Sequence, residues 1–277
     1  MISNVLYLPT RSRPVSRVRS AESSDRGAMW RSFIAERHQR SERALNAALR
    51  RYLVGSRDGY IERLEAILAP QKSVKRALSV LQWADLLATA VERTRLDRAT
   101  RGALSSAMRA SFRWAAQQVG LPELGWSAEL SPLEQNIGEM ISRVLPTQER
   151  RIRSIVEEGL LDGSSVSDMQ ARIASSPEFG LARSLTIART ETTRAVSGGS
   201  YHAYQNAAEH NVIVRQQWLS ARDSNVRDSH RALDGQEISL GGRFLIPGTG
   251  NKARYPGDFG VPEHDINCRC TVLPIVD

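Results

Sequence analysis

The sequence predicts an α+β protein, in which a mostly helical N-terminal region is followed by a small α+β C-terminal domain with few short strands and long loops. Three observations predict this arrangement. Apolar residues recur at three- and four-residue steps from about residue 27 to residue 209, which is the period of an amphipathic helix. After Asn211 the pattern changes to short strand-like runs. Glycine and proline then become dense between residues 241 and 262.

Basic charge is concentrated at the start of the chain, and it helps to define three expected regions. Residues 1–60 contain twelve arginines and five acidic residues, a net charge of +7, whereas the whole chain carries +8. We expect residues 1–26 to form a basic, disordered arm, residues 27–160 a helical domain and residues 161–277 the C-terminal domain. The arm suits an acidic partner such as packaged DNA, or it is only a solvated tail. The expected DNA contacts are Arg11, Arg13, Arg17 and Arg19.

The composition also limits the class of protein. An apolar share of 41% is enough for a real core, and no apolar run approaches the ~18–20 residues that span a bilayer. The first twenty residues are rich in arginine and lack the apolar stretch of a secretory signal. We therefore expect no membrane partner and a cytoplasmic protein, whose two cysteines stay reduced.

Glycine and proline mark the expected helix boundaries in the first half of the chain. We expect Gly55 and Gly59 to end or interrupt the first helix, and Pro70 to end the second. Pro146 is expected at the first turn of a later helix that ends near Gly159. The predicted helices span residues 27–53, 61–68, 74–98, 102–119, 133–144 and 146–159, and residues 120–132 form a connector.

A long helix from Leu181 to about Glu209 is the most informative predicted element. It follows a helix that Ser165 and Asp168 begin as a capping box and that ends near Ser175. Small side chains recur along the long helix at three- and four-residue steps, so another backbone can approach it closely. The glycines at positions 198 and 199 cost ~1 kcal/mol each relative to alanine, and we expect close packing or a bend to offset that cost.

Short strands are expected in the last third of the chain. Residues 212–214 and 216–218 are strand-like, and residues 271–273 are a further candidate. The segment from residue 241 to residue 248 predicts a turn, a short strand and another turn. The C-terminal domain should therefore have few strands and long loops.

The second half of the chain contains polar, aromatic and cysteine residues in a specific order. In the long helix these are Arg189 and Glu191, and in the C-terminal domain they are Trp218, Asp223, Arg227, His230, Asp234, Gly235, Asn267, Cys268, Arg269 and Cys270. From about residue 165 to residue 274 this order resembles the tailed-phage head morphogenesis family, the Mu F-like and SPP1 gp7-like minor head proteins. The closing Asn-Cys-Arg-Cys is the most specific part of the resemblance.

The resemblance implies a minor virion protein that acts in head morphogenesis and is not an enzyme. Such a protein would be made in the host cytoplasm during capsid assembly and would lie inside the head near the portal. Its implied partners are the portal, the major capsid protein or a scaffolding protein, together with packaged double-stranded DNA. Some members of the family bind DNA or influence its ejection, so a DNA-binding or ejection-associated role is the alternative.

The two cysteines indicate a metal site, buried packing groups or a crosslink to another chain. On a strand, Cys268 and Cys270 would place both sulfurs on one face and Arg269 on the other. Two thiolates are half of a structural zinc site, for which His230 is the third candidate ligand and His264 or Asp223 the fourth. In the alternative, the thiols only fill space and His230 bonds to a backbone carbonyl. No cofactor other than zinc is expected.

The charged residues and Trp218 each allow two interpretations. An aspartate and an arginine in one short segment usually form an ion pair that fixes a loop, and we expect Arg189 and Glu191 to pair with Asp223 and Arg227. A catalytic cluster in a metal-dependent hydrolase or a transferase toxin is the less favoured interpretation, because no nucleophile elbow or phosphate loop is present. Trp218 is more often a core anchor than a base-stacking residue.

Overall fold

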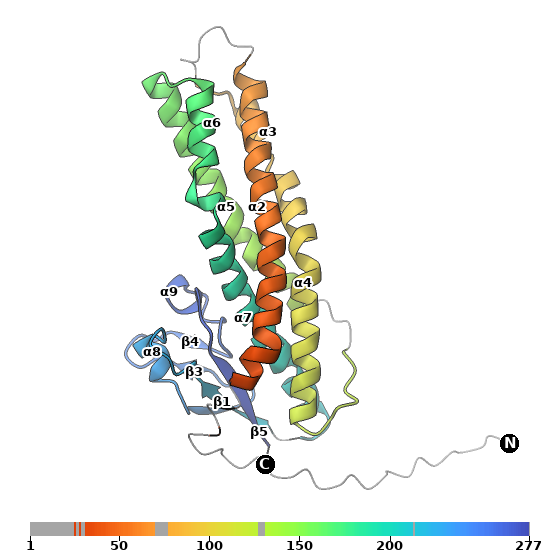
Figure 1. Cartoon of the computed structure of the whole chain (residues 1–277). Helices are drawn as coiled ribbons and strands as arrows, with labels where there is room; N and C mark the ends of the chain where they lie inside the picture. Colours follow the sequence, from red (N-terminus) through yellow and green to blue (C-terminus); the bar gives the residue numbers. More distant parts are fainter. Residues whose placement is uncertain are drawn as a thin grey trace, which may run out of the picture.

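The computed structural model describes residues 25, 28, 31–69, 77–126, 131–212 and 214–276. They form a long bundle of helices with a small strand-containing cap at one end (Figure 1). This confirms the predicted α+β fold class, with a helical N-terminal region and a few short antiparallel strands near the C-terminus. The predicted arm lies outside the described residues except for Asp25, and Arg11, Arg13, Arg17 and Arg19 lie outside them as well.

Four long helices form the shaft of the bundle, and α7 contacts the other three. The bundle consists of η1 (Ile34–His38), α2 (Gln39–Leu68), α3 (Val80–Leu87), α4 (Thr89–Gln118), α5 (Ser131–Asp162), α6 (Val166–Ala174), η2 (Pro177–Phe179) and α7 (Leu181–Glu209). Buried leucines, isoleucines and methionines of α2, α4 and α5 pack against Ile187, Ala188, Ala195 and Val196 of α7. Within the described residues, no helix is long and apolar enough to cross a membrane.

Helix α2 does not end at Gly55 or Gly59, so that prediction is wrong. A Cβ atom on Gly55 would lie 2.9 Å from Nη2 of Arg95, and one on Gly59 would lie 3.0 Å from Nη1 of Arg63. The glycines therefore leave room for guanidinium groups beside the helix. Tertiary packing outweighs the low helix propensity of glycine at both positions.

Two further predicted boundaries are also wrong. The helix expected over residues 74–98 is divided at Ala88, whose φ is +43°, and α4 continues from Thr89 through the helix predicted to begin at residue 102. Helix α5 is continuous through Pro146, where two helices were expected. A proline inside a helix costs ~3 kcal/mol, but buried apolar residues on both sides of it, such as Leu145 and Ile152, favour one continuous helix.

The predictions for α6 and α7 are confirmed. Ser165 accepts a hydrogen bond from Asp168 N and Asp168 accepts one from Ser165 N, which is the expected capping box. Gly199 packs so closely on α4 that a Cβ atom there would lie 2.4 Å from the carbonyl oxygen of Met108. The expected close approach of another backbone is therefore present.

The cap contains two small antiparallel sheets and stands on the C-terminal ends of α4 and α7. Strand β1 (Val214–Leu219) lies between β2 (Glu237–Ser239) and β5 (Thr271–Val276), and β3 (Phe244–Leu245) pairs with β4 (Lys252–Ala253). Short helices α8 (Asp228–Arg231) and α9 (Pro262–Asp265) complete it. Strands β1, β3 and β5 lie where strands were predicted, although Val212 is not part of β1 and Ile213 is outside the described residues, whereas β2 and β4 were not predicted.

One hydrophobic core joins the cap to the bundle. Trp218, Phe244 and Val272 of the cap pack with Tyr204 of α7 and Phe112 of α4. Helices α6 and α7, which the sequence assigned to the C-terminal domain, pack along the shaft (Figure 1). The domain boundary near residue 160 stays a prediction, and in the structure the elements on its two sides share cores.

Candidate metal centre and the contacts that hold it

Both cysteines and one histidine meet inside the cap. Nδ1 of His230 lies 3.6 Å from Sγ of Cys268 and 3.5 Å from Sγ of Cys270. One ligand atom from each of the three residues lies within 4.8 Å of the other two. The side chains are 1%, 2% and 4% exposed for His230, Cys268 and Cys270. This burial separates all three groups from bulk water.

His230 is held in place by its helix and by aromatic rings. It lies on the short helix α8, and its backbone N–H donates to the carbonyl oxygen of Arg227 at 3.0 Å. Its ring stacks on Phe259 at a centroid distance of 5.6 Å, and Trp218 packs against it edge-on at the same distance. Trp218 has no exposed surface, so it is a core residue in this structure and offers no face to a base.

The Cys268–Cys270 segment lies between α9 and β5, not on a strand, but its side chains alternate as on a strand. Both sulfurs face His230, whereas Arg269 points to the other side and pairs with Asp223. The guanidinium nitrogens of Arg269 lie 2.8 and 2.6 Å from the two carboxylate oxygens of Asp223. This bidentate pair holds the residue between the cysteines from the outside.

Two threonines of α7 and the residue before α8 bind the backbone at and just before the cysteines. Thr193 Oγ1 donates to the carbonyl oxygen of Cys268 at 2.5 Å, and Asn267 N donates to Thr190 Oγ1 at 3.0 Å. Arg227 donates to the carbonyl oxygen of Ile266 at 2.5 Å. Asn267 has a φ of +58°, a left-handed conformation that asparagine tolerates better than most residues. Each residue from Ile266 to Arg269 is therefore held by at least one of these contacts.

Electrostatics distinguish the two thiols. A hydrogen bond from Cys270 lowers the pKa of Cys268, and His230 lowers it further, against the effect of burial. The pKa of Cys270 is raised, because its proton is shared with Cys268 and because it is buried. The pair therefore favours a state with one thiolate on Cys268.

The two candidates for the fourth ligand, His264 and Asp223, have other partners. His264 packs near His230, with ring centroids 6.0 Å apart, but its Nε2 lies 3.0 Å from Nδ2 of Asn251. Asp223 is occupied by Arg269. A cavity of about 10 Å³ borders His230, Cys268 and Cys270, and its other lining residues are Ala221, Asn225, Val226, Arg227, Asn267 and Arg269.

The predicted pairing of Arg189 and Glu191 with Asp223 and Arg227 is wrong. Arg189 reaches Glu42 on α2 at 3.3 Å, and Glu191 pairs with Arg194 at 2.6 Å within α7. The expectation missed Arg194, which lies one turn after Glu191 on the same helical face. The spacing of Glu191 and Arg194 in the sequence was the signal for this pair.

Arg194 is the central charge of the contact between α7 and the cap. It is buried, and it donates from Nε to the carbonyl oxygen of Gly257 at 2.9 Å. Its Nη2 lies 3.6 Å from Oδ2 of Asp265, whose carboxylate also accepts from the backbone N–H groups of Phe259 and Gly260. One buried guanidinium thereby joins α7 to the loop before α9 and to α9 itself.

Asp234 and Gly235 shape the turn after α8. The Asp234 carboxylate accepts from the backbone N–H of Ser220 at 2.9 Å and from Nη2 of Arg222 at 2.7 Å. Gly235 has a φ of +84° and donates to the carbonyl oxygen of Trp218 at 2.8 Å. Both residues therefore fix the turn that leads from α8 to β2, beside β1. These hydrogen bonds connect the turn with the end of β1, and none of them is to the cysteines or His230.

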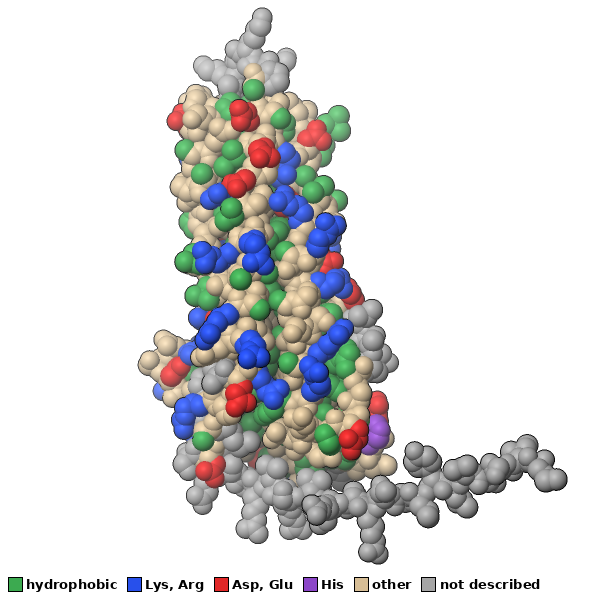
Figure 2. Space-filling model, turned by 45° about the vertical axis from the view of Figure 1, so that its right-hand side comes forward, with side chains coloured by type: hydrophobic (Ala, Val, Ile, Leu, Met, Phe, Trp, Pro, Cys, Tyr) green, Lys and Arg blue, Asp and Glu red, His purple; other side chains and the backbone are tan. Residues whose placement is uncertain are grey.

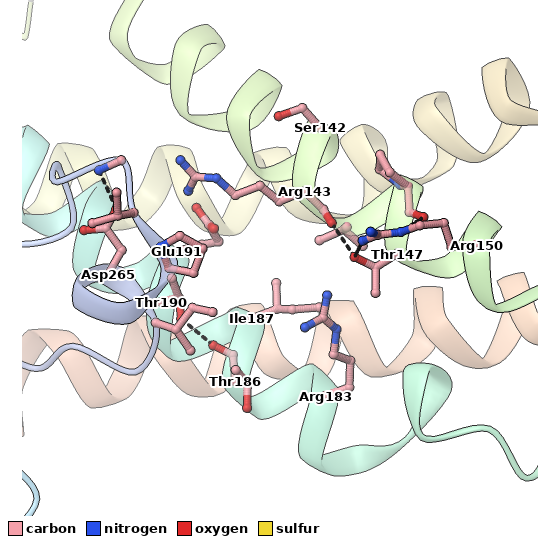
Figure 3. Close-up of a pocket in the computed structure, with 16 residues that line it drawn as sticks. Ser142, Arg143, Thr147, Arg150, Arg183, Thr186, Ile187, Thr190, Glu191 and Asp265 are labelled. Atoms are coloured by element: carbon pink, nitrogen blue, oxygen red, sulfur yellow. Dashed lines mark hydrogen bonds between the residues drawn. The ribbon is translucent and has the colours of Figure 1, made fainter.

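A larger pocket lies between α5 and α7 (Figure 3). It has a volume of about 350 Å³ and is lined by α5, α7 and the segment from Gly260 to Ile266. Glu191 and Asp265 lie at one end, and Arg150 and Arg183 lie at the other (Figure 3). Burial raises the pKa of Glu191, and the nearby Arg194 opposes that shift. The carboxylate at this end is thus part of the Arg194 contacts.

Comparison with known proteins confirms the family resemblance. Residues 150–273 match the family of phage Mu protein F-like proteins. The matched region begins within α5, includes α6 and α7, and ends in β5. It therefore contains the sulfur cluster, the contacts that hold its backbone and the Arg194 contacts.

Several curated proteins are similar over the same part of the chain. Minor head protein GP7 of Bacillus phage SPP1 is 32% identical over 128 residues, which are 46% of this chain and 40% of that protein. The NAD(+)–arginine ADP-ribosyltransferase EFV of Enterococcus faecalis is 35% identical over 119 residues, 43% of this chain and 24% of that protein. The protein YqbB of Bacillus subtilis is 27% identical over 129 residues, 46% of this chain and 41% of that protein. The chain spans less than half the length of these relatives. No solved structure matches it.

Proposed function

We propose that this chain, whose residues 150–273 belong to the phage Mu protein F-like family, is a minor head protein of a tailed phage that acts in head assembly. The observation that carries the proposal is the match of the whole α7-and-cap unit to that family, together with its similarity to a protein named for this role. In this proposal the chain lies inside the head near the portal and is synthesised in the host cytoplasm.

The geometry suits a protein that positions other components. The sulfur cluster borders a cavity of only about 10 Å³, whereas sites for small-molecule substrates are usually ≈300–1,000 Å³. Asp223, Arg227 and Asp234 are each committed to contacts that fix the cap. The cap is therefore a rigid block on a long shaft, and we infer no enzymatic role for these residues.

A transferase is the competing function, because one relative is named as an ADP-ribosyltransferase. The aligned segment makes up only 24% of that protein. The 350 Å³ pocket is large enough for a small-molecule substrate, and Glu191 would be its acid. Hydrolysis of NAD⁺ that disappears in Glu191→Gln would favour the transferase. No hydrolysis by the pure chain at micromolar concentration favours the head protein.

The end of the shaft opposite the cap is the proposed docking site for the portal or the capsid. Val80 and Leu81 of α3 and Leu161 of α5 are 84%, 77% and 89% exposed there. Figure 1 shows these helix ends together at the far end of the bundle. Exposed leucine and valine that contribute little to the core are typical of a surface that another protein covers.

Packaged DNA is the second proposed partner. Helices α2 and α4 together contain twelve arginines and six acidic residues, and Figure 2 shows basic side chains along the shaft. Arg51, Arg95 and Arg98 line a groove of about 270 Å³ between the two helices. This groove adds a described basic surface to the N-terminal arm, and phosphate contacts at either place would weaken with salt.

Incorporation into particles tests the function directly. The phage that encodes the chain is grown with the wild-type gene, with Val80→Asp/Leu81→Asp, or with the control Val54→Asp, which changes an exposed residue of α2. We expect the wild type and the control to be found by mass spectrometry in purified heads, and the tip variant to be depleted at least about tenfold, the equivalent of ~1.4 kcal/mol of binding. Wild-type protein absent from both heads and assembly intermediates would refute the proposal.

DNA contact has its own test. Binding of the pure chain to duplex DNA is measured against salt concentration for the wild type, for Arg51→Glu/Arg98→Glu, and for the control Arg150→Glu on α5. If the groove binds phosphate, the double substitution flattens the slope of log K against log[salt] by about 2, roughly one for each lost contact, and the control does not. Equal slopes for all three proteins would assign any binding to the arm.

A further inference from the structure

We propose that Cys268, Cys270 and His230 bind one zinc ion, through both sulfurs and Nδ1, with a single solvent molecule as the fourth ligand. This site goes beyond the proposed function and does not depend on it, because its three ligands and the contacts that hold them are independent of any role in the head.

The distances fit a tetrahedral ion. With Zn–S bonds of about 2.3 Å and Zn–N bonds of about 2.0–2.1 Å, tetrahedral angles place a sulfur and a nitrogen ligand about 3.6 Å apart. The two sulfur-to-Nδ1 distances here are 3.6 and 3.5 Å. Both sulfurs aim at the same ring nitrogen, which can accept only one S–H proton. A shared cation satisfies both sulfurs at once.

The donor set selects zinc among the common cations. Thiolate and imidazole ligands are preferred by zinc and other thiophilic metals, whereas magnesium and calcium prefer oxygen. His230 Nε2 is buried without a hydrogen-bond partner, as is Nδ1 of the neighbouring His264. In a metal-bound His230 the proton resides on Nε2, which is the nitrogen that points away from the sulfurs.

The fourth position has room for one small ligand. The cavity of about 10 Å³ beside the three side chains is close to the ≈10–15 Å³ that one water molecule needs. Asp223 and His264, the two sequence candidates for this position, bond instead to Arg269 and Asn251. We therefore assign the position to solvent.

The ligands are already fixed by bonds that do not involve the ion. Thr193 binds the carbonyl oxygen of Cys268, and Thr190 binds the backbone N–H of Asn267. Asp223 binds the side chain of Arg269, which lies between the two cysteines in the sequence. Arg227, next to α8, holds the backbone just before them. The ion would join α8 to the segment that enters β5, in a cap whose strands are only two to six residues long. Small loop-rich units gain most from such a link.

The test uses the full-length chain, purified without chelators from cells grown with added zinc. Elemental mass spectrometry should find about one zinc per chain, as expected for a folded structural site. Cys268→Ser, Cys270→Ser and His230→Ala should each lower the zinc content at least fivefold. The matched control is His210→Gln, which replaces a histidine at the end of α7 and should leave the zinc content unchanged.

Two measurements on the wild-type chain keep the test independent of misfolded variants. Replacement of zinc by cobalt(II) should give a sulfur-to-cobalt charge-transfer band and intense visible bands of a tetrahedral ion. X-ray absorption at the zinc edge should show two sulfur neighbours at about 2.3 Å and two lighter neighbours at about 2.0 Å.

Three outcomes would overturn the proposal. The first is a folded chain that takes up less than a tenth of an equivalent of zinc even after incubation with zinc chloride. The second is an absorption spectrum with only nitrogen and oxygen neighbours. The third is a native chain lighter by two hydrogens, which would mean that Cys268 and Cys270 form a disulfide.

Discussion

Replacing each of two adjacent glycines of α7 with alanine should change stability in opposite directions. A Cβ atom on Gly199 would lie 2.4 Å from the carbonyl oxygen of Met108 and 3.1 Å from its carbonyl carbon, so α4 and α7 would have to separate. A Cβ atom on Gly198 would meet its nearest neighbours, the ends of Met108 and Tyr255, at 3.6 Å, which is ordinary contact. The same substitution thus probes the same helix with and without a steric conflict.

The magnitudes follow from two opposing effects. Alanine gains ~0.5–1 kcal/mol over glycine inside a helix, and nothing opposes this gain at Gly198. At Gly199 the overlap involves backbone, which cannot rotate away, and overpacking of a core costs typically ~1–3 kcal/mol or more. We expect Gly199→Ala to lower the free energy of unfolding by about 2 kcal/mol net and Gly198→Ala to raise it by up to about 1 kcal/mol.

Urea and thermal unfolding followed by circular dichroism would measure both effects. For a chain of this size 1 kcal/mol corresponds to ~2–4 °C in Tm, so the two variants should differ by roughly 6–12 °C, with the wild type between them. Equal stability of Gly199→Ala and wild type would refute the close contact of α4 and α7. A loss at Gly198 as large as that at Gly199 would show that flexibility, and not space, requires the glycines.

Three further predictions concern buried polar groups and a helix cap. Burial lowers the pKa of His38 from 6.5 to about 4, with Arg189 and Arg269 adding to the shift and Glu42 3.5 Å away. The unfolded chain therefore binds the proton more tightly than the folded chain, so the stability that this group contributes is fully present above pH ~6.5 and is lost as the pH falls toward 4. The free energy of unfolding, measured in urea, should differ by about 2 kcal/mol between pH 7 and pH 5 from this group alone. His38→Gln should remove that difference. Glu191→Ala should lower the free energy of unfolding by about 3 kcal/mol in the same assay, because it leaves a buried arginine without its partner at 2.6 Å; a loss below about 1 kcal/mol would place the pair in solvent. Ser165→Ala should cost about 1 kcal/mol through the lost capping box of α6. The control Ser167→Ala, two residues later and exposed, should leave the unfolding midpoint unchanged.

Local rules predicted elements whose ends are set by the local chain. The capping residues Ser165 and Asp168 determine the start of α6, and α7 begins at Leu181 as expected. Strand β5 followed from its run of β-branched residues. In these places the hydrogen bonds that define the boundary are made by neighbours in sequence, so a single sequence contains them.

The same rules failed where a distant side chain decides the backbone. Gly55 is read as a helix breaker, yet it is in mid-helix because Arg95 of α4 occupies the space beside it. Ala88 gives no sequence signal for its φ of +43°. At the site, the clustering of His230 with the two cysteines was predicted from their motif order, but the partner of Arg189 was not, since it depends on which face of α7 meets α2. The partner of Glu191 was also missed, although its spacing from Arg194 is visible in the sequence.

Helix α7 has three kinds of contact, and the family match contains them to different extents. One face, at Gly199, meets α4; a second, at Thr190 and Thr193, holds the cysteine segment; and Arg194 with Glu191 holds the loop before α9. The matched residues 150–273 contain the second and third of these contacts in full, but only one side of the first. The polar contacts between α7 and the cap therefore lie within residues 150–273. The apolar face of α7 packs on α2 and α4, which lie outside the match. At the small residues of α7, the partner helix needs only a backbone that can approach closely, as α4 does at Met108. Packing at this face therefore depends on the shape of the partner helix.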